Sequence, residues 1–338
     1  MKRILISDPT LRDGSHAVKH QLTLEQLSVY ASAADKAGIP IVEVGHGNGL
    51  GASSLQVGES LFSDLEMLQV VKQHLTKSKL GVHVIPGFAT IKKDLSPLIS
   101  LIDVVRVASH CTEADITARH IDFAKNKGKV VYGVLMMSHM ATADILVEEC
   151  MKMESYGADG VILMDSAGSY FPSDVKEKIG AIVNKITIPV GFHAHNNLGL
   201  AIANSIAAVE AGALLLDGTI KGFGAGAGNA QLEVLVAVLG KMGYETGIDL
   251  YKILDASEIA EKNLLNTLPT IKPTSIVSGL SGVFSGFAIH VDRVSKEFGV
   301  DPRDVFFELG RRKIVAGQED IIVEVAAELS KRCFDANR

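Results

Sequence analysis

Two histidines separated by a single alanine, His193 and His195, have a spacing that could support chemistry in this 338-residue sequence. They follow the apolar run IPVG at positions 188–191. Because residues i and i+2 of a strand face the same side, both imidazoles can converge on one point. With a carboxylate such as Asp13, they would form a common site for Mn²⁺, Fe²⁺, Co²⁺ or Zn²⁺ that leaves positions open for water and substrate. The alternative is a structural pair of histidines.

Asp13 stands in the string TLRDGSH at positions 10–16, between two further candidates. Arg12 has a planar, always-charged guanidinium that can bind a carboxylate or an enolate oxygen, although its ordinary use would be a salt bridge. His16 can act as a general base if it reaches a bound substrate, although a loop histidine is more often a solvated surface residue. Other polar residues that follow apolar runs are Asp8, Glu43, His46, His110, Ser138, His139, Asp165, Ser166 and Asn196.

Eight short apolar runs are candidates for the strands that position these side chains. The runs are RILISD (3–8), IVEVGH (41–46), LGVHVI (80–85), VVRVAS (104–109), VVYGVLMM (130–137), GVILMD (160–165), IPVGFHAH (188–195) and LLLDGTIKG (214–222). They are continuous rather than alternating, which is typical of strands buried on both faces. They alternate with helical patterns over about 240 residues, close to the length of a (β/α)₈ barrel.

Residues typical of helix ends support this alternation of strands and helices. Thr23 with Gln26 and Ser63 with Glu66 have the spacing of capping boxes, and Gly38 and Gly128 stand where helices should end. An open doubly wound sheet would place a glycine-rich fingerprint after the first strand, where TLRDGSH stands instead. We therefore expect the α/β class with a TIM-type (β/α)₈ barrel over residues 1–250, whose polar residues gather at the carboxyl ends of the strands.

The glycine run GFGAGAGN at positions 222–229 follows the eighth predicted strand. Its G-x-G-x-G pattern is a weak phosphate signal, and barrels often place a phosphate or another tightly approached ligand after this strand. Asn229 can either reach the metal site or cap the next helix, and the sequence slightly favours the cap.

The pattern changes after Gly240. Amphipathic periodicity predicts helices without intervening strands over residues 250–265, 278–299, 302–312 and 319–332, with a break near Pro269 and Pro273. We expect residues 251–338 to form a helical C-terminal domain.

Composition excludes several classes of function. The net charge is −6 without a basic stripe, which argues against nucleic-acid binding, and no apolar stretch approaches the roughly 20 residues that span a bilayer. The first residues do not resemble a signal peptide, so we expect a soluble, cytoplasmic protein. The three cysteines are far apart and odd in number, which argues against a disulfide framework or a thiolate metal site.

Several strings together resemble one enzyme family. They are TLRDGSH (10–16), MMSHM (136–140), MESYGAD (153–159), HAHNN (193–197), GAGAGNAQLEV (224–234) and GQEDIIVEVA (317–326). The chain resembles the 4-hydroxy-2-oxovalerate aldolases, class II pyruvate aldolases of the HMG-CoA-lyase-like superfamily, over nearly its full length. The resemblance implies cleavage of 4-hydroxy-2-oxoacids to pyruvate and an aldehyde, as in the breakdown of aromatic hydrocarbons.

The resemblance also implies roles for residues. The metal ligands would be Asp13, His193 and His195, with Mn²⁺ the usual ion. Arg12 would stabilise the pyruvate enolate and His16 would act as the base on the 4-hydroxyl group. Arg12, Ser166 and His193 would contact the substrate.

One position departs from the family pattern. The family carries a tyrosine in the segment that resembles GVFSGF, where this sequence has Phe284, which cannot donate a hydrogen bond. Members of the family pair with an acylating acetaldehyde dehydrogenase, which the helical domain would contact, and oligomerisation is left open. Two alternatives stand beside the aldolase: a Claisen-type condensing enzyme or lyase acting on an acyl-CoA, and a weakly active subunit that stabilises an aldehyde dehydrogenase.

Overall fold

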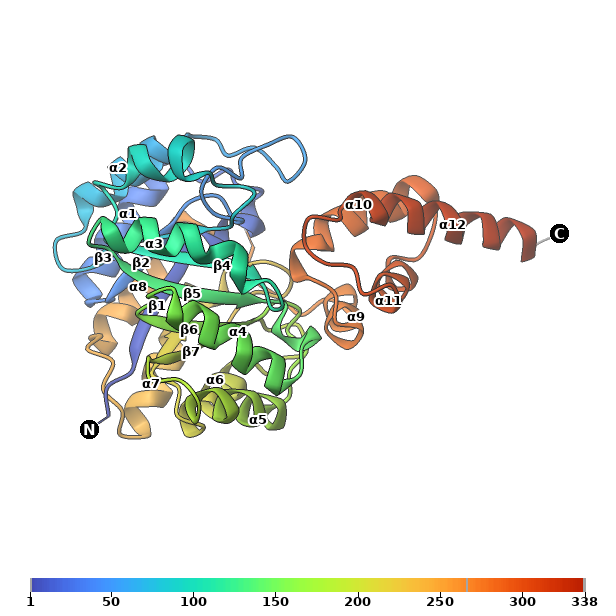
Figure 1. Cartoon of the computed structure of the whole chain (residues 1–338). Helices are drawn as coiled ribbons and strands as arrows, with labels where there is room; N and C mark the ends of the chain where they lie inside the picture. Colours follow the sequence, from blue (N-terminus) through green and yellow to red (C-terminus); the bar gives the residue numbers. More distant parts are fainter. Residues whose placement is uncertain (1, 266, 337–338) are drawn as a thin grey trace.

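Eight parallel strands close into a barrel in the order of the sequence, which confirms the predicted (β/α)₈ fold (Figure 1). The computed structural model describes residues 2–265 and 267–336. The strands are β1 (Leu5–Leu11), β2 (Ile41–Val44), β3 (Lys79–Val84), β4 (Val104–His110), β5 (Val130–Met136), β6 (Gly160–Asp165), β7 (Val190–Ala194) and β8 (Leu215–Asp217).

Helices surround this barrel. They are α1 (Leu24–Ala37), α2 (Asp64–His74), α3 (Ala118–Asn126), α4 (Ala143–Ser155), α5 (Pro172–Val183), α6 (Ala201–Glu210), α7 (Leu232–Lys241) and α8 (Leu250–Asn263). Both predicted capping boxes are confirmed: Thr23 begins α1 and Ser63 begins α2, each with its side chain accepting from the third helical N–H. Between β3 and β4 the crossover is a short π-helical turn, Ile91–Leu95, followed by the 3₁₀ turn Ser96–Leu98.

The interior of the barrel is only partly apolar. The strand layer and its helices enclose the main hydrophobic core, whereas the cluster inside the barrel is small and includes Val104, Ala108, Val134 and Met164. Barrel interiors are ordinarily filled by bulky apolar residues. Here part of that space is occupied by buried charged side chains, namely Glu43, Arg106 and Asp217.

Helices α9 (Pro273–Ser281), α10 (Ala288–Phe298), α11 (Pro302–Arg311) and α12 (Asp320–Ala336) lie to one side of the barrel and share their own apolar core (Figure 1). Helix α8 instead packs against α1, and the side chain of Gln26 donates to the carbonyl of Asn263 at 2.6 Å. These contacts favour a boundary after α8; the expected division between residues 250 and 251 stays a prediction. None of the helices in the described ranges is long and apolar enough to cross a membrane.

The single helix predicted over residues 278–299 is wrong. Gly282 has a φ of +66°, which ends α9 in a left-handed cap, and the chain then makes the 3₁₀ turn Ser285–Phe287 before α10 begins. The interruption brings this segment to the barrel, because the amide of Ser285 donates to the carbonyl of Ser166 at 3.0 Å.

Candidate metal centre and active site

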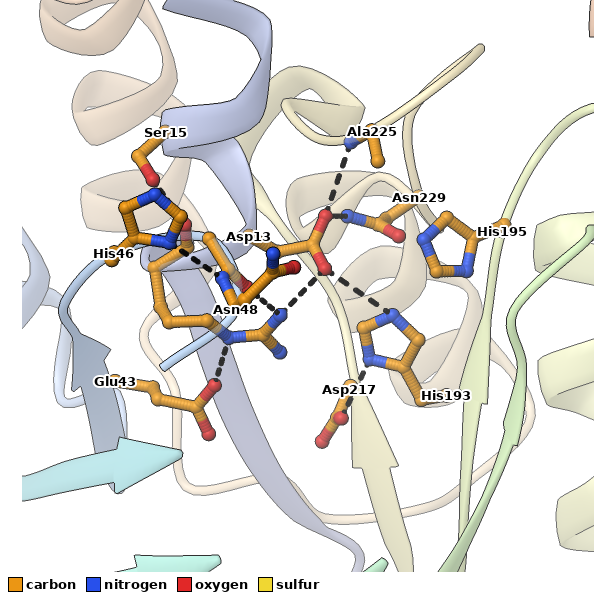
Figure 2. A network of polar contacts seen from close by, with 12 residues as sticks. Asp13, Ser15, Glu43, His46, Asn48, His193, His195, Asp217, Ala225 and Asn229 are labelled. Carbon is orange, nitrogen blue, oxygen red and sulfur yellow. Dashed lines mark hydrogen bonds and ion pairs between the residues drawn. The ribbon is translucent and has the colours of Figure 1, made fainter. Parts of the chain in front are cut away.

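Asp13, His193 and His195 meet at the carboxyl ends of β1 and β7 (Figure 2). One potential ligand atom of each residue lies within 4.8 Å of those of the other two. His193 Nε2 is 4.0 Å from Asp13 Oδ2. All three side chains are buried, so the fold brings together the three residues that the sequence suggested.

The outer nitrogens of both histidines are held by the protein. His193 Nδ1 lies 2.8 Å from Asp217 Oδ2, and His195 Nδ1 donates to the carbonyl of Asp165 at 2.9 Å. Hydrogen bonds of this kind orient metal-binding imidazoles and leave their Nε2 lone pairs available. His193 Nε2 is buried and has no hydrogen-bond partner. A buried nitrogen without a partner is expected where a ligand belongs.

Asp13 is held as a carboxylate. Its Oδ1 accepts from Asn229 Nδ2 at 3.0 Å and from the amide of Ala225 at 3.1 Å, and its Oδ2 accepts from Arg12 Nη1 at 2.8 Å. Burial opposes ionisation, but Arg12 and the two histidines outweigh it and hold the pKa of Asp13 well below its usual range. Two imidazole nitrogens and an ionised carboxylate are a donor set that fits a divalent cation.

The glycine run lies directly against this carboxylate. A Cβ at Gly224 would lie 2.7 Å from Asp13 Oδ1, so a larger residue would displace the loop. Asn229 faces Asp13 rather than capping the next helix, because α7 has Gln231 at its N-cap without a side-chain bond. The slightly favoured role of Asn229 as a helix cap is therefore wrong. The glycine run instead holds the carboxylate of Asp13 in place.

A chain of buried charges links the arginine to one of the histidines. Arg12 Nε donates to Glu43, whose other oxygen accepts from Arg106 Nη1 at 2.8 Å. Arg106 Nη2 donates in turn to Asp217, which holds His193. Burial opposes ionisation of Glu43, but Arg106 and Arg12 lower its pKa to about 2.

Sequence reasoning missed Arg106 and Asp217 and gave Glu43 no role. The available signal was a single charge inside an otherwise apolar run, as in VVRVAS and LLLDG. Arg106 is the largest fully buried side chain in the described part of the protein.

His16 lies beside this centre and remains neutral. Its imidazole fills the space that a Cβ at Gly47 would need, and burial, together with the charge of Arg12, lowers its pKa below the usual value. It lines a cavity of about 340 Å³ together with His20 and Phe284. A neutral imidazole at the edge of a cavity can accept a proton from a bound molecule.

Ser166 is buried at the end of β6. Its hydroxyl accepts from the amide of Met137 at 2.9 Å, which leaves the hydroxyl hydrogen free to donate. Its backbone carbonyl accepts from Ser285, so the C-terminal segment helps to fix this loop.

Two family models match the chain, an HMGL-like model over residues 3–260 and a DmpG-like communication domain over residues 269–331. The chain is 62% identical to the 4-hydroxy-2-oxovalerate aldolase of Pectobacterium atrosepticum, across 98% of this chain and 97% of the relative. This chain belongs to the HMGL-like family and, within it, to the 4-hydroxy-2-oxovalerate aldolases. A second aldolase of that name, from Burkholderia pseudomallei, is 50% identical across 97% of this chain and 94% of the relative.

Solved structures show the same fold in more distant proteins. The N-terminal domain of a Bacteroides vulgatus protein described as an aldolase matches 88% of this chain and 98% of its own, with a TM-score of 0.73 and 26% identity. The carboxyl transferase domain of Rhizobium etli pyruvate carboxylase reaches a TM-score of 0.83 at 16% identity, over 98% of this chain and 61% of that chain. At that identity the likeness shows the fold alone.

Several polar residues singled out in the sequence have structural partners in this member of the family. Asp8 accepts a hydrogen bond from Tyr30, and the carboxylate of Asp165 accepts from the amides of Ser169 and Tyr170. Ser138 donates to the carbonyl of Met164. His46 bonds to the carbonyl of Gly58, His139 to the carbonyl of Gly282, and Asn196 to the amide of Ala201. His110 Nδ1 lies 2.8 Å from Thr112 Oγ1. These contacts stabilise the loops around the site.

Proposed function

We propose that this protein is a divalent-metal-dependent carbon–carbon lyase that cleaves 4-hydroxy-2-oxoacids, such as 4-hydroxy-2-oxopentanoate, to pyruvate and an aldehyde. The observation that carries the proposal is the buried cluster of Asp13, His193 and His195, with the unpartnered Nε2 of His193 facing it. Membership of the aldolase family supports the same reaction and implies a divalent metal.

Asp13, His193 and His195 would hold the metal, for which we propose Mn²⁺ on the basis of the family. A bound divalent cation acts as a Lewis acid toward the 2-oxo group of the substrate. The rest of the chemistry belongs to side chains of the protein.

Arg12 is oriented toward this reaction. Its Nε and Nη1 are bound by Glu43 and Asp13, whereas its Nη2 is buried without a partner. That free donor can bind the oxygen that gains charge as the enolate forms, and a donor already in place stabilises a developing charge without reorganisation. The hydroxyl of Ser166 donates to the 2-oxoacid.

His16 supplies the base. It takes the proton of the 4-hydroxyl group, the carbon–oxygen bond at C4 becomes the aldehyde carbonyl, and the bond between C3 and C4 breaks. The electron pair of that bond passes to the pyruvate enolate, and protonation at C3 completes pyruvate. The low pKa of His16 keeps the imidazole neutral and able to accept this proton near neutral pH.

The helical C-terminal domain, proposed over residues 251–338, would contact an acylating acetaldehyde dehydrogenase that consumes the aldehyde. The match of residues 269–331 to a DmpG-like communication domain supports this partner. The cytoplasmic location and the place in aromatic hydrocarbon catabolism stay predictions.

The test is a pyruvate-release assay. Purified protein is loaded with Mn²⁺, Co²⁺, Mg²⁺ or Zn²⁺ and offered 4-hydroxy-2-oxoacids of increasing chain length. We expect metal-dependent release of pyruvate that is lost on chelation. Release of free thiol from acetyl-CoA with consumption of pyruvate would favour the Claisen alternative, and no turnover with any substrate would contradict the proposal.

A further inference from the structure

The amino-terminal end of the barrel holds a cavity that has no part in the reaction described above. Its volume is about 420 Å³, and the first residue of each of strands β1 to β5 lines it. Figure 1 shows the N-terminus on the side of the barrel away from helices α9–α12. Asp13, His193 and His195 meet at the carboxyl ends of β1 and β7, so this cavity and the proposed metal centre lie at opposite ends of the barrel.

The floor of the cavity is apolar. Ile41, Val104 and Tyr132 belong to the apolar cluster inside the barrel, and Leu5 and Val130 pack against that cluster. The cavity therefore reaches the lowest layer of the barrel interior. A bound molecule could bury an apolar body against this floor, which is a common arrangement in small-molecule sites.

Tyr132 adds one polar group to the floor. The residue is 8% exposed. The hydroxyl groups of the other two buried tyrosines, Tyr30 and Tyr170, are hydrogen-bonded to side chains, whereas that of Tyr132 has no such partner among the residues that the structure describes. Buried polar groups ordinarily have a partner, so an unpaired hydroxyl on a residue that lines a cavity is available to a ligand.

The rim of the cavity is positively charged. Arg3, Lys77 and Lys79 lie on it, and within the described ranges no aspartate or glutamate lines it. A Cβ at Gly247 would lie 3.5 Å from Arg3 Nη2, which places the guanidinium beside a lining residue of the cavity. None of the three cations forms an ion pair in the part of the chain that the structure describes. Three positive charges therefore border one cavity without a counter-charge, in a chain whose net charge is −6.

The acidic residues near this end of the barrel do not neutralise the rim. Asp103 and Asp159, which directly precede β4 and β6, each pair with another lysine at 2.6 Å. Asp35 accepts from backbone amides. Glu245 contacts the start of the chain through its backbone, and the structure describes no ion pair between its carboxylate and Arg3. The positive charge of the rim is therefore open to an anion from solution.

We propose that this cavity binds a small organic anion, in which a compact apolar body carries a carboxylate or phosphate group. The apolar body would pack on Val104 and on the ring of Tyr132. The anionic group would meet Arg3, Lys77 and Lys79 at the rim. A guanidinium suits this role, because its planar fork binds carboxylates and phosphates through two parallel hydrogen bonds. The position of the cavity makes its ligand distinct from the substrate of the metal centre.

Ligand-observed ¹⁹F NMR with 4-fluorobenzoate tests the proposal. The full-length protein is kept metal-free with EDTA, so that the carboxylate cannot bind a metal at the active site. We expect a dissociation constant on the order of 1 mM, which is ordinary for a ligand of about ten heavy atoms. 4-Fluorobenzyl alcohol has the same ring without the charge and should bind at least about tenfold more weakly. Added salt should weaken the binding of 4-fluorobenzoate, because exposed charges are screened.

Variants locate the probe at this end of the barrel. Arg3→Gln combined with Lys79→Gln removes two exposed charges and should raise the dissociation constant at least about tenfold. Tyr132→Phe removes only the hydroxyl group and should raise it about fivefold, the factor that one hydrogen bond typically supplies. Lys296→Gln is the matched control, because Lys296 lies exposed on α10, away from the cavity, and its variant should bind as wild type does.

Equal binding by wild type and the double variant would overturn the proposal, as would a lack of detectable binding by wild type. Displacement of the probe by pyruvate would also overturn it, because the probe would then lie at the active site. Equally strong competition by inorganic phosphate would show that the apolar floor contributes nothing, which contradicts the proposed class of ligand. None of these measurements needs a metal or turnover, so their failure would leave the proposed aldolase function in place.

Discussion

The two halves of the barrel mouth are built differently. On the side of β1, β2, β7 and β8, buried charges are fixed by one another through Arg106, which reaches across from β4 and joins Glu43 to Asp217. On the side of β3 to β6, the interior is largely apolar, with Ala108 and Met164 among its residues, apart from Arg106 and His83. The charged side holds Asp13, Arg12 and His193, which we propose to bind the metal and the 2-oxoacid, so its buried charges bear on the reaction itself.

The charged half carries an energetic cost. Burying an ion pair removes two charges from water, and their attraction repays this only when the geometry and the remaining hydrogen bonds are good. Glu43 and Asp217 each contact Arg106, so removal of one member leaves a buried charge uncompensated. We therefore expect substitutions in the charged half to have larger effects than substitutions in the apolar half.

The largest effect is expected for Asp13→Asn. The substitution removes the only carboxylate of the proposed metal site in the described structure and weakens the partner of Arg12. We expect Mn²⁺ binding, measured by calorimetry, to fall below detection and pyruvate release to fall at least about a thousandfold, because a metal that polarises a carbonyl supplies several kcal/mol of stabilisation. Wild-type turnover by the variant would contradict the assignment.

Asp35→Asn is the matched control, because Asp35 lies outside the barrel and accepts from the amides of Thr76, Lys77 and Ser78. These hydrogen bonds overcome burial and lower its pKa to about 2. Its ionised form therefore stabilises the fold above about pH 4, and this contribution disappears as the pH falls toward 2. The variant should lose about 2 kcal/mol of unfolding free energy at neutral pH and bind Mn²⁺ normally.

A smaller effect is expected for Arg106→Lys, which keeps the charge but cannot bridge two carboxylates with the same geometry. Among the residues that the structure describes, Arg106 forms no hydrogen bond with the proposed metal ligands or with Arg12 and Ser166, so it acts through Asp217 and Glu43. Loss of such outer support typically costs about 10- to 100-fold in metal affinity or activity.

Mn²⁺ titration and the separate changes in kcat and KM measure this effect, and thermal unfolding shows whether the variant is folded. Arg303→Lys is the control, because Arg303 forms an exposed ion pair with Asp301 far from the barrel mouth. A folded Arg106→Lys with normal metal affinity and normal kcat would show that the chain of charges is structural only.

The sequence could predict the features that depend on local patterns, but not those that depend on contacts across the barrel. The eight strands follow from local apolar runs and are confirmed, and His193 and His195 follow from the two-residue period of a strand. The pairing of Arg106 with Asp217 depends on β4 and β8 lying across a closed barrel, which no local pattern encodes. The break after α9 was missed because Gly282, which ends the helix in a left-handed conformation, lies inside an otherwise amphipathic pattern.

The smallest effect is expected for Phe284→Tyr, at the edge of the mouth. The ring of Phe284 packs edge-on against Phe287, with centroids 5.5 Å apart, and lines the cavity that His16 also lines. A tyrosine would add one donor to that cavity without disturbing the metal ligands. We expect kcat/KM to change by less than about tenfold, since one added hydrogen bond is worth about 1 kcal/mol. The ratio of kcat/KM between the two C4 enantiomers should shift by several-fold.

The ratio between enantiomers, measured with both forms of 4-hydroxy-2-oxopentanoate, is the informative quantity, because a donor beside His16 can distinguish which face of C4 carries the hydroxyl. Phe307→Tyr on α11 adds the same hydroxyl at a half-exposed position and should leave the ratio unchanged. A shift in Mn²⁺ affinity in Phe284→Tyr would mean that the C-terminal segment also governs the charged half. An unchanged affinity with a changed ratio would place Phe284 among the side chains that select the substrate.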